Sequence, residues 1–470
     1  MKKVIIVLFV VLIGCLSSIG YAQQNPNVEF FTVEVAQPGD PSFEKNVFGG
    51  VPLVQVGSDI GDLVIWERAG VSSDKGVMQG KLLSALDHPA TNIADFPSSS
   101  WVLQLSDKYF LREDFGISII GRPVKLIDDP AADFMILKPN IKFGEPHLLD
   151  KYLIMQVPTD LGRYELWGKL TENIKDVSTD SFKLIGFTMH QIRHFRIVSS
   201  DNYIGWLQSG EVDPRVFQIK HVKDIFNLDV APIQIPAGKG RNSFPGETLL
   251  GFVGNRFLYI CYPDAMHDGF CYVDLDDPNQ QEQVIKMFDT PDVNIFNGTV
   301  PVVISAKLTD QYLFWIEDYF DRAVGFLNDY VFAWPVNELD DPSAIIQVTT
   351  DGAGASFLDA DENVAVWSGV DVIIGSSAIR GARLPWLFIR GDADNNGNVN
   401  LSDAIYLLNH LFRGGPPLRC QDAGDADDNG ELNITDAVYI LLHLFLGGPA
   451  PLAPYPEMGP DPTPDNLVCK

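Results

Sequence analysis

The stretch Asp310-Gln-Tyr-Leu-Phe-Trp315 (DQYLFW) is the clearest copy of a motif that recurs along most of the chain. In each copy an Asp or Asn precedes a run of aromatic and aliphatic residues, the composition of a half-buried β-strand. The copies begin at Asp62 (DLVIW), Asp107 (DKYFL), Asp150 (DKYLI), Asp201 (DNYIGW), Asn255 (NRFLY), Asp310 and, more loosely, Asp361 (DENVAVW). Their starting points lie 45, 43, 51, 54, 55 and 51 positions apart, which indicates seven related units.

Each unit continues with a polar stretch and a second strand-like run, such as Arg163 to Trp167 or Gly269 to Val273, and this order predicts a hairpin. Four units then carry an acidic turn that ends in proline. Proline cannot donate to a central ladder, so these turns belong between strands. They are Asp87-His88-Pro89, Asp128-Asp129-Pro130, Asp276-Asp277-Pro278 and Asp340-Asp341-Pro342.

A period of roughly 40 to 55 residues with several strands per unit is typical of β-propeller blades, which bury their faces by stacking around an axis. We therefore predict a mainly β fold with about seven blades. The last unit is short and needs a strand from near Val28 to Val35 to close the ring. Six or eight blades, or two irregular β-sandwiches, are alternatives. The repeats resemble those of TolB-like propellers from about residue 50 to residue 380.

The N-terminus reads as an export signal. Lys2 and Lys3 precede an apolar run from Val4 to Leu16, and Gly20-Tyr21-Ala22 offers a small-residue cleavage site, which predicts a signal peptide over residues 1–22. Alternatively, Leu12 to Cys15 resembles a lipobox, which would leave Cys15 lipidated. No later run is long enough to span a bilayer. We expect an extracellular or cell-surface protein without a transmembrane segment in its mature form.

The amino-acid composition limits the fold class and the classes of partner. A hydrophobic content of 46% excludes a mainly disordered polymer, and 470 residues predict at least two folded units. The net charge of −28 argues against nucleic acid and suits divalent cations. Cys261, Cys271, Cys420 and Cys469 suit disulfides, with three pairings open. Nearness in sequence favours Cys261 with Cys271 and Cys420 with Cys469, and buried free thiols are the alternative.

After Arg390 the sequence turns into two acidic units whose starts lie 33 residues apart. The first loop is 392–403 and the second is 425–436. Ca²⁺ takes six to eight oxygen ligands, and a twelve-residue loop supplies them from alternating positions around a glycine turn. Gly397 and Gly430 stand at that turn. The sequence therefore predicts two Ca²⁺ ions, with candidate ligands Asp392, Asp394, Asn396, Asn398 (main chain), Asn400 and Asp403, then Asp425, Asp427, Asn429, Glu431 (main chain), Asn433 and Asp436.

Each loop runs into a segment with helical apolar spacing that ends at Gly414-Gly415 or Gly447-Gly448. Ser402 and Thr435 are the predicted N-caps. A complete EF-hand has another helix before its loop, but Leu384-Pro385-Trp386 and Gly414 to Pro417 leave no room for one.

With these features, residues 388–470 resemble the dockerin type I module. The resemblance implies two calcium-stabilised loop-helix units with near two-fold symmetry, which bind a cohesin domain and often attach polysaccharide-degrading enzymes to a scaffold. In that family loop positions 10 and 11 help to choose the cohesin. Here they are Leu401-Ser402 and Ile434-Thr435, which depart from the paired hydroxyl residues of cellulosome members. Residues 23–387 then form the propeller-like domain, and the Pro-rich tail from Pro449 to Cys469 wraps back through a cysteine bridge.

The sequence offers little evidence of catalysis. His190 and His194 lie in a strand-like context and are interpreted as surface residues, and Glu317-Asp318 as a solvated strand end. The recurring tryptophans are interpreted as blade packing; they are Trp66, Trp167, Trp206, Trp315, Trp334 and Trp367. We favour a non-catalytic propeller adaptor, with carbohydrate as one candidate ligand and a cohesin-like domain or cell-surface scaffold as partner. The alternative is a propeller-based glycoside hydrolase or lyase in polysaccharide catabolism, anchored by the same tail.

Overall fold

The computed structural model describes residues 28–35, 54–57, 63–69, 75–97, 103–106, 108–114, 118–127, 129–137, 146–149, 151–159, 164–177, 182–188, 197–208, 215–237, 249–261, 269–277, 279–288, 302–321, 326–349, 355–371, 376–463 and 465–469. The predicted signal peptide, Cys15, His190 and His194 lie outside these ranges.

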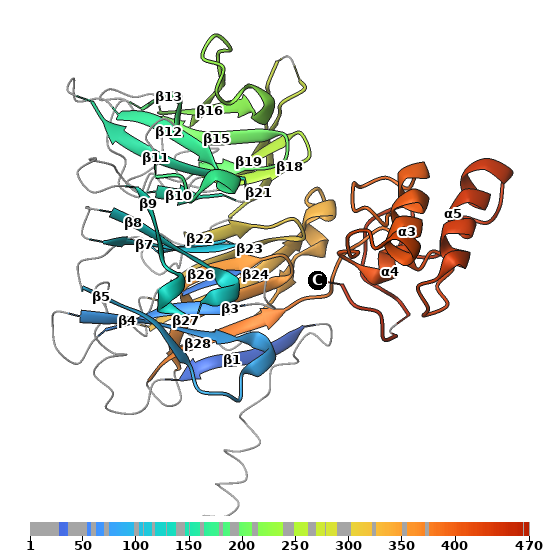
Figure 1. Ribbon diagram of the computed structural model, residues 1–470, viewed down its shortest axis with the longest axis horizontal. Coiled ribbons are helices and arrows are strands. Elements are labelled where there is room, and N and C mark those ends of the chain that lie inside the picture. Colours follow the sequence, from blue (N-terminus) through green and yellow to red (C-terminus); the bar gives the residue numbers. More distant parts are fainter. Residues whose placement is uncertain are drawn as a thin grey trace, which may run out of the picture.

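Most of the described residues form seven four-stranded antiparallel sheets, the blades of a β-propeller (Figure 1). Blades 1 to 3 are β2 (Val54–Gly57), β3 (Leu63–Ala69), β4 (Lys75–Leu82) and β5 (Thr91–Pro97); β6 (Leu103–Leu105), β7 (Tyr109–Asp114), β8 (Ser118–Pro123) and β9 (Phe134–Leu137); β10 (Pro146–Leu148), β11 (Tyr152–Pro158), β12 (Tyr164–Leu170) and β13 (Lys183–Thr188). Blades 4 to 6 are β14 (Ile197–Ser199), β15 (Tyr203–Gln208), β16 (Arg215–His221) and β17 (Ile233–Ala237); β18 (Leu249–Val253), β19 (Arg256–Cys261), β20 (Gly269–Asp274) and β21 (Glu282–Met287); β22 (Val302–Leu308), β23 (Tyr312–Asp321), β24 (Phe326–Pro335) and β25 (Ile346–Gln347).

Blade 7 closes the ring with a strand from near the N-terminus. Its strands β26 (Ala355–Asp361), β27 (Val364–Asp371) and β28 (Ser376–Arg383) are completed by β1 (Glu29–Val35). The β1–β28 pair is antiparallel, with Glu29 opposite Arg383. The predicted seven blades and the predicted closing strand are both confirmed.

The hydrophobic core is divided into clusters that lie between neighbouring blades. One such cluster joins each adjacent pair, from blades 1 and 2 around to blades 7 and 1. Each sheet therefore buries apolar side chains against both neighbours, which is how a repeat that cannot bury both faces alone becomes stable. The predicted packing role is confirmed for the buried tryptophans Trp66, Trp206, Trp315, Trp334 and Trp367. Trp167 is half-buried and donates to Glu165 at 2.8 Å.

The aromatic run of the repeated motif lies in the second strand of each blade. Asp201 lies between β14 and β15, and Asp310 between β22 and β23. The acidic proline turns lie between strands, as predicted, and each falls between the third and fourth strands of its blade. Two of them begin short 3₁₀ helices, η3 (Pro130–Ala132) and η8 (Pro342–Ala344), whose preceding Asp accepts a hydrogen bond from a backbone N–H group.

A second repeated feature, which the sequence analysis missed, is a buried cation near the end of the third strand. Arg122, Lys169 and Lys220 occupy the same place in β8, β12 and β16, shortly before a 3₁₀ turn. Each donates to backbone carbonyls in or just after that turn: Arg122 to Ile127, Lys169 to Ile174 and Asp176, and Lys220 to Asn227. These cations satisfy carbonyls at the turn that would otherwise lack a donor.

The C-terminal part is helical and lies at one side of the propeller (Figure 1). Its helices are α3 (Leu401–Arg413), α4 (Gln421–Gly424) and α5 (Ile434–Leu446). The helix ends at Gly414 and Gly447 agree with the prediction, since both have positive φ angles of 66° and 65°. Within the ranges that the structure covers, no helix has the length and apolarity to cross a membrane.

Two local predictions about these helices are wrong. The N-caps are Asn400 and Asn433, not Ser402 and Thr435, because the Asn side chains accept the backbone N–H groups of those two residues. The space before the second loop also holds a helix, α4, which has four residues and directly precedes Asp425. A single turn fits between Cys420 and the loop although a longer helix would not.

Candidate metal centre

The first acidic loop brings three carboxylates together. Ligand oxygens of Asp392, Asp394 and Asp403 lie within 4.8 Å of one another. Asp392 and Asp403 are buried, at 4% and 0% exposure. Asp403 is carried on the first turn of α3, so the fold of the helix places it against the start of the loop. Three carboxylates at this separation repel one another unless a cation or a proton compensates them.

Backbone N–H groups hold two of these carboxylates in place. Asp392 accepts from Asn396 at 3.0 Å and from Gly397 at 2.8 Å, which closes the glycine turn over it. Asp403 accepts from Asn400 at 2.7 Å and from Asp394 at 3.2 Å. These hydrogen bonds therefore fix the orientation of both side chains.

Asp394 has an oxygen without a partner. Its Oδ2 accepts from Ser402 Oγ at 2.5 Å, whereas its Oδ1 is buried and has no hydrogen-bond donor within the described ranges. A buried carboxylate oxygen without a donor is costly. The donor set is all oxygen, the chemistry that Ca²⁺ prefers. The residues present therefore fit a calcium ion.

The second loop repeats this arrangement. Ligand oxygens of Asp425, Asp427 and Asp436 lie within 4.8 Å of one another. Asp425 accepts from Asn429 at 3.2 Å and from Gly430 at 2.8 Å, and Asp436 accepts from Asn433 at 2.8 Å. The two loops thus share one hydrogen-bond pattern at equivalent positions.

The pKa shifts of Asp403 and Asp436, at equivalent positions of the two loops, also match. Burial, together with the charges of neighbouring Asp394 and Asp392, raises the pKa of Asp403 to about 7. Burial and the charges of Asp425 and Asp427 raise the pKa of Asp436 to about 7. Burial raises the pKa of Asp392 as well. A bound cation would reverse these shifts, because it favours the ionised carboxylate.

The other predicted ligands lie around the carboxylates in hydrogen-bonded positions. Asn396 and Asn429 accept the backbone N–H groups of Asn398 and Glu431, at 3.1 and 3.0 Å. Asn400 and Asn433, predicted as metal ligands, serve as helix caps through their side-chain oxygens. The backbone oxygens of Asn398 and Glu431 accept from the side chains of Asn400 and Asn433.

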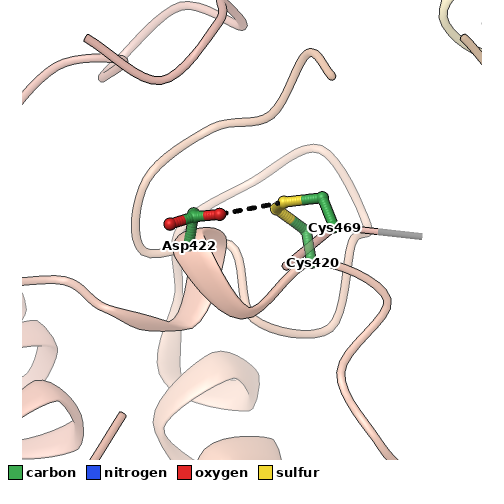
Figure 2. Close-up of side chains that lie close together, drawn as sticks. All are labelled: Cys420, Asp422 and Cys469. Carbon is green, nitrogen blue, oxygen red and sulfur yellow. Dashed lines mark hydrogen bonds between the residues drawn. A yellow bond between two sulfur atoms is a disulfide. The ribbon is translucent and has the colours of Figure 1, made fainter. Parts of the chain in front are cut away.

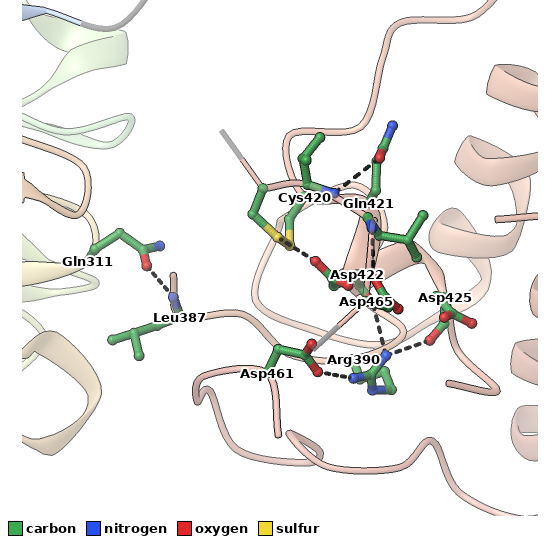
Figure 3. The surroundings of a disulfide bond; sticks show 12 residues. Gln311, Leu387, Arg390, Cys420, Gln421, Asp422, Asp425, Asp461 and Asp465 are labelled. Carbon is green, nitrogen blue, oxygen red and sulfur yellow. Dashed lines mark hydrogen bonds and ion pairs between the residues drawn. A yellow bond between two sulfur atoms is a disulfide. The ribbon is translucent and has the colours of Figure 1, made fainter. Parts of the chain in front are cut away.

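Arg390, which the sequence analysis did not single out, connects the second loop to the C-terminal tail (Figure 3). It has no exposed surface and donates to the backbone oxygen of Asp425 at 3.0 Å. Its Nη2 pairs with Asp428 at 3.0 Å and with Asp461 at 2.8 Å. Thr463 of the tail also donates to Asp428, at 2.7 Å. We call Arg390, Asp428, Asp461 and Thr463 the tail clasp. Its sequence signal was a lone cation directly before an acidic stretch.

Both favoured disulfides are present, Cys261–Cys271 across the β19–β20 hairpin and Cys420–Cys469 between α4 and the tail. Asp422 points its carboxyl group at the sulfur of Cys469, 3.3 Å away (Figure 2). Because a disulfide sulfur carries no hydrogen, this contact is a hydrogen bond only when Asp422 is protonated. Burial and the nearby charges of Asp465 and Asp461 raise its pKa to about 6. The bonded cysteines are therefore structural rather than metal ligands.

The two long helices expose matching apolar side chains. On α3 these are Leu401, Ile405 and Phe412, and on α5 Ile434, Val438 and Phe445, all between 47% and 63% exposed. Their opposite sides pack together through residues that include Leu407 and Ile440. We call these six residues, three at equivalent positions on each helix, the exposed apolar set.

Among the described residues of the propeller, no group of three His, Cys, Asp or Glu side chains gathers as the loop carboxylates do. The prediction that Glu317 lies at a solvated strand end is wrong. Its side chain is buried, accepts from Trp315 at 2.8 Å, and has Lys286 at 3.9 Å.

No protein-family model and no curated protein matches this sequence. Solved structures with similar folds include the Pyrococcus horikoshii acylaminoacyl peptidase, 11% identical over 70% of this chain and 51% of that one, with a TM-score of 0.43. A Mycobacterium tuberculosis puromycin-hydrolyzing peptidase is 10% identical over 74% and 54%, with a TM-score of 0.48. The β-propeller domain of the Trilobed protease from Pyrococcus furiosus is 13% identical over 71% and 94%, with a TM-score of 0.44.

The chain spans about half the length of the first two of these proteins. Sequence identities and TM-scores this low support no inference about the activity of this protein. The propeller rests on the sheet topology of this protein itself.

Proposed function

We propose that this chain is an exported modular protein whose C-terminal part, residues 388–470, binds two Ca²⁺ ions and docks the propeller onto a partner outside the cytoplasm. The partner class is a cohesin-like domain or a cell-surface scaffold, in a setting where polysaccharide is processed. The propeller then acts as a binding domain, with carbohydrate as a candidate ligand.

One observation carries the calcium part of this proposal. Two loops, 33 positions apart, hold carboxylate triads in which two of the three members are buried, with the same pattern of backbone donors around each. A chance acidic turn has no reason to recur with the same pattern of hydrogen bonds. Because calcium binds the folded loops and not the unfolded protein, each site adds about 2.7 kcal/mol to stability at about 100 times its Kd.

The exposed apolar set supports the second part. It places three large exposed apolar side chains at equivalent positions on each of two helices, and exposed apolar surface marks interaction sites. The resemblance to dockerin type I modules points to a cohesin-like partner, and Leu401 and Ile434 at loop position 10 point to an apolar surface on it.

The test uses the full chain without its predicted signal peptide. Calorimetric titration should register two calcium ions per molecule. The double variant D392A/D425A should lose this uptake, while D229A, which removes an exposed Asp from a turn after β16, should keep it. Absence of calcium uptake by the unaltered protein would refute the proposal.

Docking is tested separately against a panel of purified cohesin domains. Binding should require calcium and should be lost in the double variant F412S/F445S, which leaves both loops intact. If that variant bound every cohesin as well as the unaltered protein, the exposed apolar set would not be the docking surface.

A further inference from the structure

Both loops contain an Asn–Gly pair at the glycine turn, Asn396–Gly397 and Asn429–Gly430. Both Asn side chains are exposed. Asn–Gly is the dipeptide in which the backbone nitrogen of the second residue most easily reaches the side-chain amide carbon of the first, because glycine has no Cβ and adopts many backbone conformations. The pairs coincide with the proposed calcium ligands, so a reaction there would change the metal site.

In the folded first loop the backbone nitrogen of Gly397 is already engaged in a hydrogen bond. Gly397 donates its N–H to Asp392 at 2.8 Å, and the side-chain oxygen of Asn396 accepts from Asn398 at 3.1 Å. The attacking nitrogen has to lose its hydrogen, and a hydrogen bond to a carboxylate makes this loss harder. Turning the nitrogen toward the amide carbon would also break the bond to Asp392. A closed loop therefore protects its Asn–Gly pair.

The two loops differ in how firmly they are closed. The tail clasp fixes Asp428, and Asp465 lies beside Gly430, where a methyl group would meet its Oδ2 at 3.3 Å. Around Gly397 no described atom lies within 4 Å of the same point. The second loop is thus held from outside, whereas the first depends on its own hydrogen bonds. Local opening is easiest where outside contacts are fewest.

We propose that Asn396 is a deamidation site that becomes reactive when the first loop is free of calcium, and that the tail clasp shields its counterpart Asn429. The Gly397 nitrogen forms a bond to the Asn396 amide carbon, and the bond from that carbon to the amide nitrogen breaks. Ammonia leaves with the hydrogen from Gly397. Water then opens the cyclic imide to Asp or to isoaspartate. No oxidant or reductant takes part.

The consequence is a limit on how long the calcium-free protein can still take up calcium again and then dock. Isoaspartate adds a backbone carbon directly before the glycine turn and so misplaces the ligands that follow it. This consequence rests on the proposed calcium binding, whereas the order of reaction, Asn396 before Asn429, rests on the clasp alone.

The test follows deamidation of the full chain by peptide mapping and mass spectrometry at mildly alkaline pH, with excess calcium or with a chelator. With chelator, deamidation at Asn396 should be several-fold faster than with calcium and several-fold faster than at Asn429. Asn297–Gly298, outside both loops, is an internal reference that should not respond to calcium. Equal rates at Asn396 under both conditions, in a protein shown by calorimetry to bind calcium, would overturn the inference and leave the proposed function standing.

A second measurement tests the clasp. The variant T463V removes one bond to Asp428 and keeps the disulfide, and it should speed deamidation at Asn429 in chelator without changing the rate at Asn396. If Asn429 already reacts as fast as Asn396 in the unaltered protein, the clasp does not protect it. This comparison holds whether or not calorimetry registers calcium.

Discussion

At the scale of single residues, Lys169 shows what a buried charge does in this fold. Its side chain is 1% exposed, and Nζ donates to the backbone oxygens of Ile174 and Asp176 at 3.1 and 2.8 Å. The ring of Phe182 lies 4.5 Å from the same atom. Burial lowers the pKa of Lys169 to about 8, against the opposing effect of Asp176. The charge is costly, but it satisfies two carbonyls at a turn.

This pKa predicts a pH effect on stability. Between about 8 and 10.5 the unfolded protein still holds the Lys169 proton while the folded protein has released it. Stability therefore rises with pH across this window, by about 3 kcal/mol at most. Urea unfolding across the window should show the full rise in the unaltered protein and in K223M, which changes an exposed lysine, and a smaller rise in K169M, where burial still lowers the pKa of Lys220. Identical pH profiles for K169M and the unaltered protein would contradict the assignment.

At the scale of elements, α3 and α5 begin in the same way. Asn400 and Asn433 cap the helices. In turn, the side chains of Asp403 and Asp436 accept a hydrogen bond from the backbone N–H group of the cap residue. Such reciprocal capping satisfies two backbone donors at once. The same Asp residues belong to the carboxylate triads, so helix formation and loop closure depend on shared side chains.

Capping predicts a specific pattern of stability. N400A should cost about 1 kcal/mol of stability in the helical part, whereas N400D should keep most of it because Asp also accepts the bond. Circular dichroism during calcium-free thermal unfolding measures this. Equal losses in N400A and N400D would show that the cap contributes nothing.

At the scale of the whole molecule, the helical part is fixed to blades 6 and 7 rather than joined by a loose linker. Leu387 donates its N–H to Gln311 at 2.6 Å (Figure 3) and packs in the cluster between these blades. Met458 of the tail packs against the same cluster. Arg419 pairs with Asp310 at 3.2 Å and with Glu362 at 2.9 Å. A docked partner would therefore meet the propeller in one orientation.

These contacts differ in strength. L387A removes a side chain that is 4% exposed and should lower the free energy of unfolding by about 2–5 kcal/mol. R419A breaks pairs at a partly solvated rim and should cost no more than about 1 kcal/mol. Urea unfolding followed by tryptophan fluorescence would separate the two. A larger loss in R419A than in L387A would mean that the charges, not the apolar packing, hold the interface.

Some features of the structure could be predicted from the sequence and others could not, as individual residues show. The aromatic motif at Asp310 and its copies were enough for the blade count, because each copy begins the same strand. The loop carboxylates could be chosen because spacing alone determines which side chains of a short loop face inward. The caps were misplaced by two residues, since Asn, Ser and Thr are all good caps and spacing does not distinguish between them. The role of Arg390 could not be predicted, because its partners lie up to 71 positions away.

Local order in the sequence thus specifies the repeated strands, the two acidic loops and the glycine helix ends, since each depends on neighbours within a few residues. Three features depend on the tertiary structure and are not encoded by any local pattern. They are the contact of the tail clasp with the second loop alone, the packing of the helical part against blades 6 and 7, and the burial of Lys169. These features arise from contacts between distant segments, and their energies depend on burial, which exists only once the protein has packed.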